Sequence, residues 1–138
     1  MKSQIIKNRE RAAQMLAFDG LTYGKSGRLR PTDIDLSIDW QGRSFVFVEV
    51  KGNYMPLTPG QQYHLQGLVN GLRKAELSAI AVHVNHDTPD ANHDIFVKDC
   101  VVVQFYDGKR RGWVKPSKKT TLEEFMQDLY EKHEAGGF

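Results

Sequence analysis

The strongest constraint on the fold is a strictly alternating segment that is followed at once by an apolar one. Between Asp33 and Trp40 apolar and polar residues alternate, so a strand would place four acidic or hydroxyl side chains on one face: Asp33, Asp35, Ser37 and Asp39. Residues 41–43, Gln-Gly-Arg, are typical of a tight turn. Residues 45–50 are apolar on both faces until Glu49, as in a central strand covered on two sides. The pattern predicts a β-hairpin with one carboxylate-rich face.

The remaining elements follow from apolar spacing and from breakers. Helical periodicity predicts a helix over residues 3–18, a second helix that follows the break at Pro59-Gly60 and runs to about residue 75, and a final helix that opens at Thr121. Further strands are predicted at three places: residues 78–84, 100–106 and 111–114. A chain of 138 residues with 40% hydrophobic content suits one domain over residues 1–138. We therefore expect a single α/β (α+β) domain, with a mixed central sheet of four to five strands flanked by helices on both sides.

Composition excludes several classes of protein. No segment has the roughly 18 apolar residues that a membrane span needs, and the amino-terminal residues lack the apolar run of a signal peptide. We therefore expect a cytoplasmic protein with no membrane partner. The single cysteine, Cys100, excludes an internal disulfide and a cysteine-based zinc site, and its strand-like surroundings indicate a buried core thiol.

The formal net charge of +2 is small, but the charges are unevenly distributed. Residues 109–119 contain six basic residues and no acidic one. A second basic excess, within residues 1–30, ends in a loop that contains Lys25, Arg28 and Arg30. The composition leaves two interpretations open for these segments: contacts to a polyanion, or solvated surface.

The triplet Glu49-Val50-Lys51 places a carboxylate and an ammonium on the same face at the end of a buried strand. If the hairpin loop has three residues, either Asp33 or Asp35 lies opposite Glu49, whereas a two-residue loop would turn the faces apart. At about 4 Å and an effective dielectric near 20, two opposed carboxylates repel by about 4 kcal/mol. Such a pair must share a proton or gain positive charge. Lys51 supplies one charge, and Mg²⁺, which accepts few hard oxygen ligands completed by water and phosphate, is the natural source of the rest.

These residues resemble the PD-(D/E)XK nuclease superfamily, also called restriction endonuclease-like, over the stretch from Glu10 to about residue 66. The resemblance consists of an acidic residue in the first helix, Asp35 in the first strand, Glu49-Val50-Lys51 in the next, and glutamines that open the following helix, Gln61 first among them. Pro31 does not directly precede an aspartate, which keeps the choice between Asp33 and Asp35 open. We prefer Asp35 because it lies within the predicted strand.

The resemblance implies a magnesium-dependent DNA endonuclease or exonuclease, in which Mn²⁺ can substitute for Mg²⁺. Asp35 and Glu49 would bind the metal, with Glu10 assisting directly or through water. Lys51 would position or activate the attacking water, and Gln61 would contact DNA or that water. DNA is the expected partner, with its backbone phosphates met by three basic residues: Lys25, Arg28 and Arg30. A homodimer and a phage or mobile-element origin are compatible with the same resemblance.

Two other functions compete with this prediction. The first is a nucleic-acid-binding or assembly module that keeps the fold without cleaving, although Asp35, Glu49 and Lys51 are all present. The second is a hydrolase built on a cluster of histidines and aspartates: His83, His86, Asp87, Asp90, His93 and Asp94. Their spacing matches neither HExxH nor a paired-histidine helix motif, and a polar loop would recruit the same residue types.

Overall fold

The computed structural model describes residues 19–27, 31–89 and 91–138. The chain divides into two compact units, residues 1–31 and 32–138, so the single domain expected over residues 1–138 stays a prediction. In the first unit the described residues include a short 3₁₀ turn, η1 (Lys25–Gly27). The helix predicted over residues 3–18 lies outside the described residues.

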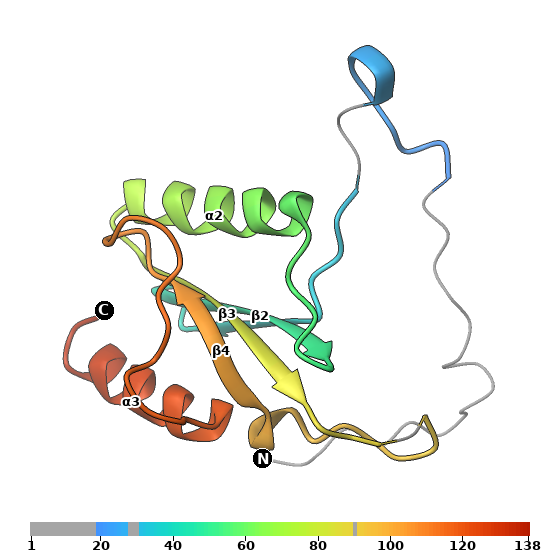
Figure 1. Cartoon of the computed structure of the whole chain (residues 1–138). Coiled ribbons are helices and arrows are strands. Elements are labelled where there is room, and N and C mark those ends of the chain that lie inside the picture. Colours follow the sequence, from blue (N-terminus) through green and yellow to red (C-terminus); the bar gives the residue numbers. More distant parts are fainter. Residues whose placement is uncertain (1–18, 28–30, 90) are drawn as a thin grey trace. The chain divides into compact units, whose positions relative to one another are not determined.

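The second unit contains a mixed four-stranded sheet in the order β1 (Leu36–Trp40), β2 (Ser44–Gly52), β3 (Ser78–His86) and β4 (Val101–Tyr106). The first and last pairs are antiparallel. The central pair, β2 and β3, is parallel and is connected through helix α2 (Pro59–Lys74) (Figure 1). A 3₁₀ turn, η2 (Val97–Asp99), precedes β4, and helix α3 (Leu122–Glu134) follows it. The predicted mixed sheet with flanking helices is confirmed.

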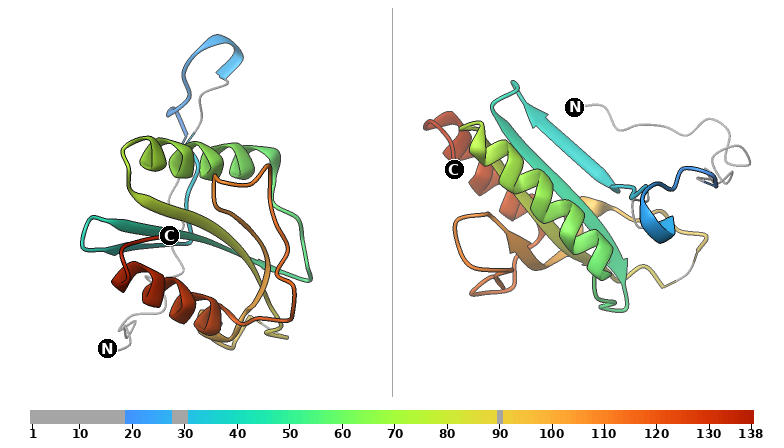
Figure 2. Two further views of the ribbon diagram at one scale, coloured as in Figure 1. Left: turned by 90° about the vertical axis from the view of Figure 1, so that its left-hand side faces the viewer. Right: turned by 90° about the horizontal axis from the view of Figure 1, so that it is seen from above.

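The two helices cover opposite faces of the sheet (Figure 2). Leu65 and Val69 of α2 pack against one face, where the small side chains of Ala79 and Ala81 leave room for the helix. The other face packs against α3 through a larger apolar cluster: Val46, Val48, Ile80, Val82, Val84, Cys100, Val102, Leu122 and Leu129. Because both faces of β2 and β3 are covered, these strands are apolar on both sides, as the sequence predicted for β2. The buried position predicted for Cys100 is also confirmed.

The hairpin between β1 and β2 has a three-residue loop, one of the two registers that the sequence allowed. Trp40 pairs with Ser44, so Gln41, Gly42 and Arg43 form the loop. Gln41 and Gly42 have positive φ angles of 59° and 66°, and the N–H of Gly42 donates to Asp39 Oδ1 at 2.7 Å. Because the loop has an odd number of residues, the carboxylate face of β1 coincides with the Glu49 face of β2.

Several predicted strand limits differ from those observed, and β3 extends to His86 rather than ending at Val84. β1 begins at Leu36 rather than at Asp33, because the Asp35 side chain, not its backbone, accepts the Val50 N–H there. The strand predicted over residues 111–114 is reduced to one bridge between Val114 and Phe105. Gly112, with a φ of 74°, interrupts the extended conformation just before that bridge. In the part of the chain that the structure describes, no helix is long and apolar enough to cross a membrane.

Candidate functional site

Two carboxyl groups face each other where β2 leaves the hairpin. Leu36 pairs with Val48, so Asp35, one residue earlier, stands opposite Glu49. The Val50 N–H donates to Asp35 Oδ2 at 2.8 Å, which fixes the direction of that carboxylate. Glu49 is buried, with 3% of its surface exposed, whereas Asp35 is exposed. The preference for Asp35 over Asp33 as the partner of Glu49 therefore agrees with the register.

Glu49 is held in an environment that opposes its ionisation. Burial, the negative charge of Asp35 and a hydrogen bond with the Asp35 side chain together raise the pKa of Glu49 from 4.5 to about 7. The backbone of Asp35 partly offsets this rise, and the more distant Asp33 adds to it. Near neutral pH Glu49 is therefore partly protonated, and its protonated form can hydrogen-bond to the Asp35 side chain, which is one of the two solutions expected for an opposed pair.

Lys51 lies on the same face as Glu49, two residues further along β2, and is half-buried. Its register partner on β3 is Asn85, which is buried. The Asn85 side-chain oxygen accepts the Tyr54 N–H at 2.7 Å, and its amide donates to Asp87 Oδ1 at 3.3 Å. Asn85 thus anchors the start of the connection to α2 beside Lys51.

His83 is the site residue whose place beside Glu49 the sequence analysis missed. It pairs with Glu49 across the parallel strands and is buried, with 2% of its surface exposed. Gln104 of β4 meets its Nδ1 at 3.1 Å, while its Nε2 has no hydrogen bond of ordinary geometry among the described residues. Burial lowers the pKa of His83, the backbone of Met55 acts in the opposite direction, and the positive charge of Lys51 lowers it further.

A signal for His83 was present in the alternation of β3. Ala79, Ala81, His83 and Asn85 occupy one face of this strand, and the apolar residues between them, an isoleucine and two valines, occupy the other. A polar pair at the end of an otherwise apolar strand indicates neighbours that satisfy it. Only the parallel pairing of β2 with β3 identifies those neighbours as Glu49 and Lys51.

The structure gives Gln61 a defined local role. Thr58 is the N-cap of α2, and its hydroxyl accepts the Gln61 N–H at 3.2 Å. Gln61 Oε1 in turn accepts the Thr58 N–H at 3.0 Å, which completes a capping box. The side-chain carbonyl of Gln61 is therefore engaged in the cap, and its amide group is the part that remains for other contacts.

The remaining predicted site residues, four in number, all belong to the unit of residues 1–31. Glu10, Arg28 and Arg30 lie outside the described residues. Lys25 lies in η1, in the unit of residues 1–31, and is exposed.

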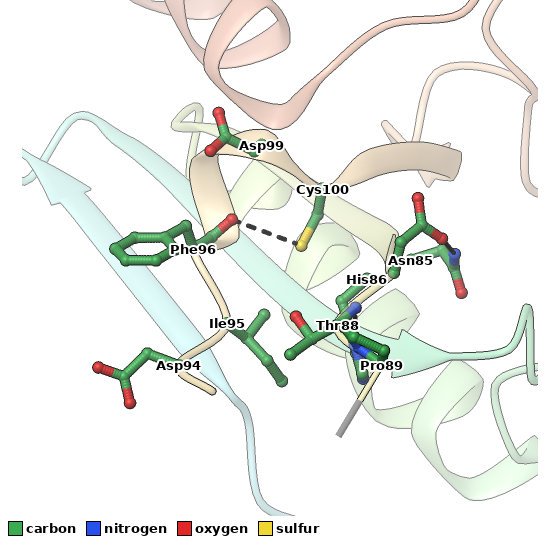
Figure 3. Close-up of a pocket in the computed structure, with 10 residues that line it drawn as sticks. Asn85, His86, Thr88, Pro89, Asp94, Ile95, Phe96, Asp99 and Cys100 are labelled. Atoms are coloured by element: carbon green, nitrogen blue, oxygen red, sulfur yellow. Dashed lines mark hydrogen bonds between the residues drawn. The ribbon is translucent and has the colours of Figure 1, made fainter. Parts of the chain in front are cut away.

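The competing cluster of histidines and aspartates is divided by the strand. His83 shares the α2 face of the sheet with Ala81, whereas His86 lies on the opposite face. The His86 ring packs against Gly52, because a Cβ added to that glycine would lie 2.6 Å from His86 Nε2. Beyond β3 the chain lines a pocket of about 320 Å³ with Asp94, Asp99 and Cys100 (Figure 3). The Cys100 thiol there donates to the Phe96 carbonyl at 3.8 Å.

No group of three histidine, cysteine or acidic side chains that could hold a metal occurs among the described residues. The pair Asp35 and Glu49 nevertheless fits the modest demand of Mg²⁺, which is commonly held by one or two carboxylates, with water and phosphate completing its shell. A divalent cation would also relieve the repulsion that raises the pKa of Glu49. The residues present therefore fit a magnesium ion through two protein ligands.

Comparisons of the chain with protein-family models, curated proteins and solved structures found no match.

Proposed function

We propose that this protein is a magnesium-dependent nuclease that hydrolyses phosphodiester bonds of DNA in the cytoplasm. The observation that carries the proposal is the opposed pair of Asp35 and Glu49 with Lys51 on the same face. A buried carboxyl with a pKa near 7 is unusual in a merely structural position, and perturbed acids concentrate at functional sites. The resemblance to the PD-(D/E)XK pattern assigns the same three residues.

Each residue has a distinct part in this proposal. Asp35 and Glu49 would hold the ion, which supplies an activated water and neutralises charge on the phosphate. The Val50 N–H keeps the Asp35 carboxylate in place. Lys51 presents an ammonium beside the two carboxyl groups, where it can orient the attacking water or stabilise the phosphate. His83, which meets Gln104 through its Nδ1, lies beside Glu49 on the next strand.

The test is cleavage of a labelled duplex in Mg²⁺ by the wild type and by Lys51→Ala. We expect Lys51→Ala to lower the cleavage rate at least about 100-fold, the lower range for a positioned proton-transfer group. Lys74→Ala is a matched control because Lys74 is an exposed lysine at the end of α2. Equal rates for Lys51→Ala and Lys74→Ala, or cleavage that persists in EDTA, would refute the proposal.

A second candidate is a nucleic-acid-binding or assembly module without cleavage. One observation favours it: the described residues provide two, not three, clustered ligands for a metal. Protonation of Glu49 would also relieve the carboxyl pair without any cation. This candidate predicts that the wild type binds a duplex equally in Mg²⁺ and in EDTA and leaves it intact.

A further inference from the structure

The connection between β4 and α3 carries a concentrated positive charge. Its residues 109–119, here called the basic connection, hold six exposed cations and no acid: Lys109, Arg110, Arg111, Lys115, Lys118 and Lys119. Within the described residues, Arg110 is the one member of this set with an ion pair, to Asp107 at 3.5 Å. It also lies over the ring of Phe105, 5.6 Å from the centroid. The other cations form no ion pair among the described residues, although the charge of Lys118 helps to lower the pKa of Glu124.

The second half of the basic connection, residues 115–119, is held on both sides by the sheet. Val114 and Phe105 exchange two backbone hydrogen bonds, of 2.8 and 2.9 Å. At the other end the Val102 N–H donates to the Thr120 carbonyl at 2.8 Å. Six residues, 115–120, span a length that three residues of β4 cover between these bridges. The segment therefore bulges from the edge of the sheet, between two points at which the sheet anchors it. In Figure 1 it runs beside β4 and between the two helices.

The strand register places this bulge level with the carboxyl site. Val101, at one end, pairs with Asn85, which pairs with Lys51. Phe105, at the other end, pairs with Val82, which pairs with Val48. Along the strand direction, the bulge therefore lies at the same height as Glu49. Across the sheet, β3 and β4 lie between it and β2, which gives three strand spacings, or about 14 Å. This separation is close to the ~12 Å width of the DNA major groove.

We propose that the basic connection is a second contact surface for the phosphate backbone of the nucleic acid whose cleavage is proposed above. The identity of the polyanion depends on that proposed function. The charge and position of the surface come from the basic connection itself. A duplex with one strand at Glu49 brings phosphates of the other strand to Lys115, Lys118 and Lys119. These contacts fix the orientation of the duplex and carry no sequence information.

The test measures duplex binding in EDTA, without cleavage, as a function of salt concentration. Replacing Lys115, Lys118 and Lys119 with alanine should reduce the slope of log K against log salt by about 3, one for each phosphate contact. The same lysines replaced with arginine should retain the wild-type slope, because the charge is kept. The matched control replaces Lys74, Lys98 and Lys132 with alanine, which removes the same charge from exposed positions elsewhere.

A smaller slope of log K against log salt in the basic-connection alanine variant alone supports the inference. If the wild type also fails to cleave DNA, the proposed activity is refuted and the inference about the contact surface stands. If the wild type cleaves DNA but its slope of log K against log salt equals that of this variant, the inference is overturned and the proposed activity stands. Equal losses in the variant and its control, or a wild type that does not bind the duplex, also overturn it. A variant that keeps duplex binding but loses binding to anionic phospholipid vesicles would assign the surface to membranes instead, and would overturn the inference.

Discussion

At the scale of single residues, the environment of Glu49 decides the electrostatics of the site. A glutamate at the end of a strand is normally ionised at neutral pH, but Glu49 is buried and faces a second carboxyl group. Its pKa of about 7 means that a small change of pH, or the arrival of a cation, changes its charge. This property makes the site measurable through stability as well as through activity.

The contribution of Glu49 to the free energy of unfolding should fall as the pH rises from 4.5 to 7, whereas the lowered pKa of His83 makes a contribution of the opposite sign. In this window the folded protein retains the Glu49 proton, while the unfolded chain, with a usual pKa of 4.5, releases it. Below pH 4.5 Glu49 is protonated in both states, so its burial beside Asp35 does not lower the free energy of unfolding. Above pH 7 Glu49 is ionised in both states, and the destabilisation by burial and by Asp35 reaches its full size. A shift of this size corresponds to no more than about 3 kcal/mol. Urea denaturation at a series of pH values measures it.

Glu49→Gln isolates this contribution from other titrating groups. Glutamine is uncharged at every pH, so the variant should lose the decrease between pH 4.5 and 7 and be more stable than the wild type at pH 8. Glu76→Gln, at an exposed position, serves as the control and should follow the wild type. Parallel stability curves for the wild type and Glu49→Gln would show that Glu49 does not carry the raised pKa.

At the scale of elements, the start of α2 separates a structural role of Gln61 from a functional one. Thr58→Ala removes the N-cap hydroxyl and should lower the free energy of unfolding by about 1 kcal/mol. Gln61→Glu should keep the capping box, because a glutamate at this position accepts the same Thr58 N–H. Chemical denaturation of both variants measures the effect.

The same variants test the predicted contact of Gln61 with DNA or water. If the Gln61 amide contacts the substrate, Gln61→Glu should fold as stably as the wild type and cleave more slowly, because the amide donor is lost. Thr58→Ala should change stability and leave cleavage by the folded protein unchanged. Equal cleavage by Gln61→Glu and the wild type would limit Gln61 to the helix cap.

Local sequence patterns were enough to predict most of the helices and strands, but they do not specify which strands pair when the strands are distant in sequence. Alternation and turn residues were enough to predict the hairpin and the Glu49 face, since these depend on neighbours in sequence. The choice between Asp33 and Asp35 depended on the register, which the loop length sets. The residues around His83 depend on the parallel pairing of β2 and β3, two strands separated by a whole helix. No local pattern specifies that contact.

At the scale of the whole unit of residues 32–138, the topology gathers the polar groups at one end of an otherwise apolar sheet. The parallel connection through α2 aligns β3 with β2 so that Glu49 meets His83 and Lys51 meets Asn85. Toward the other end, the same face is filled by Phe47, Ala79 and Ala81 under α2. The apolar core therefore provides the stability that allows an unfavourable carboxyl pair to persist at the end of the sheet.

Magnesium should stabilise this unit, and the stabilisation should grow with pH. A cation that binds only the folded state adds about 2.7 kcal/mol at a concentration 100 times its Kd. Protons compete with the cation for Glu49, so the rise in melting temperature should be larger at pH 8 than at pH 6. Thermal denaturation with Mg²⁺ and with EDTA at the two pH values measures this difference. Glu49→Gln should respond weakly at both, since one ligand is lost, whereas Glu76→Gln should respond like the wild type. An equal response in Glu49→Gln and the wild type would place any bound magnesium away from the carboxyl pair.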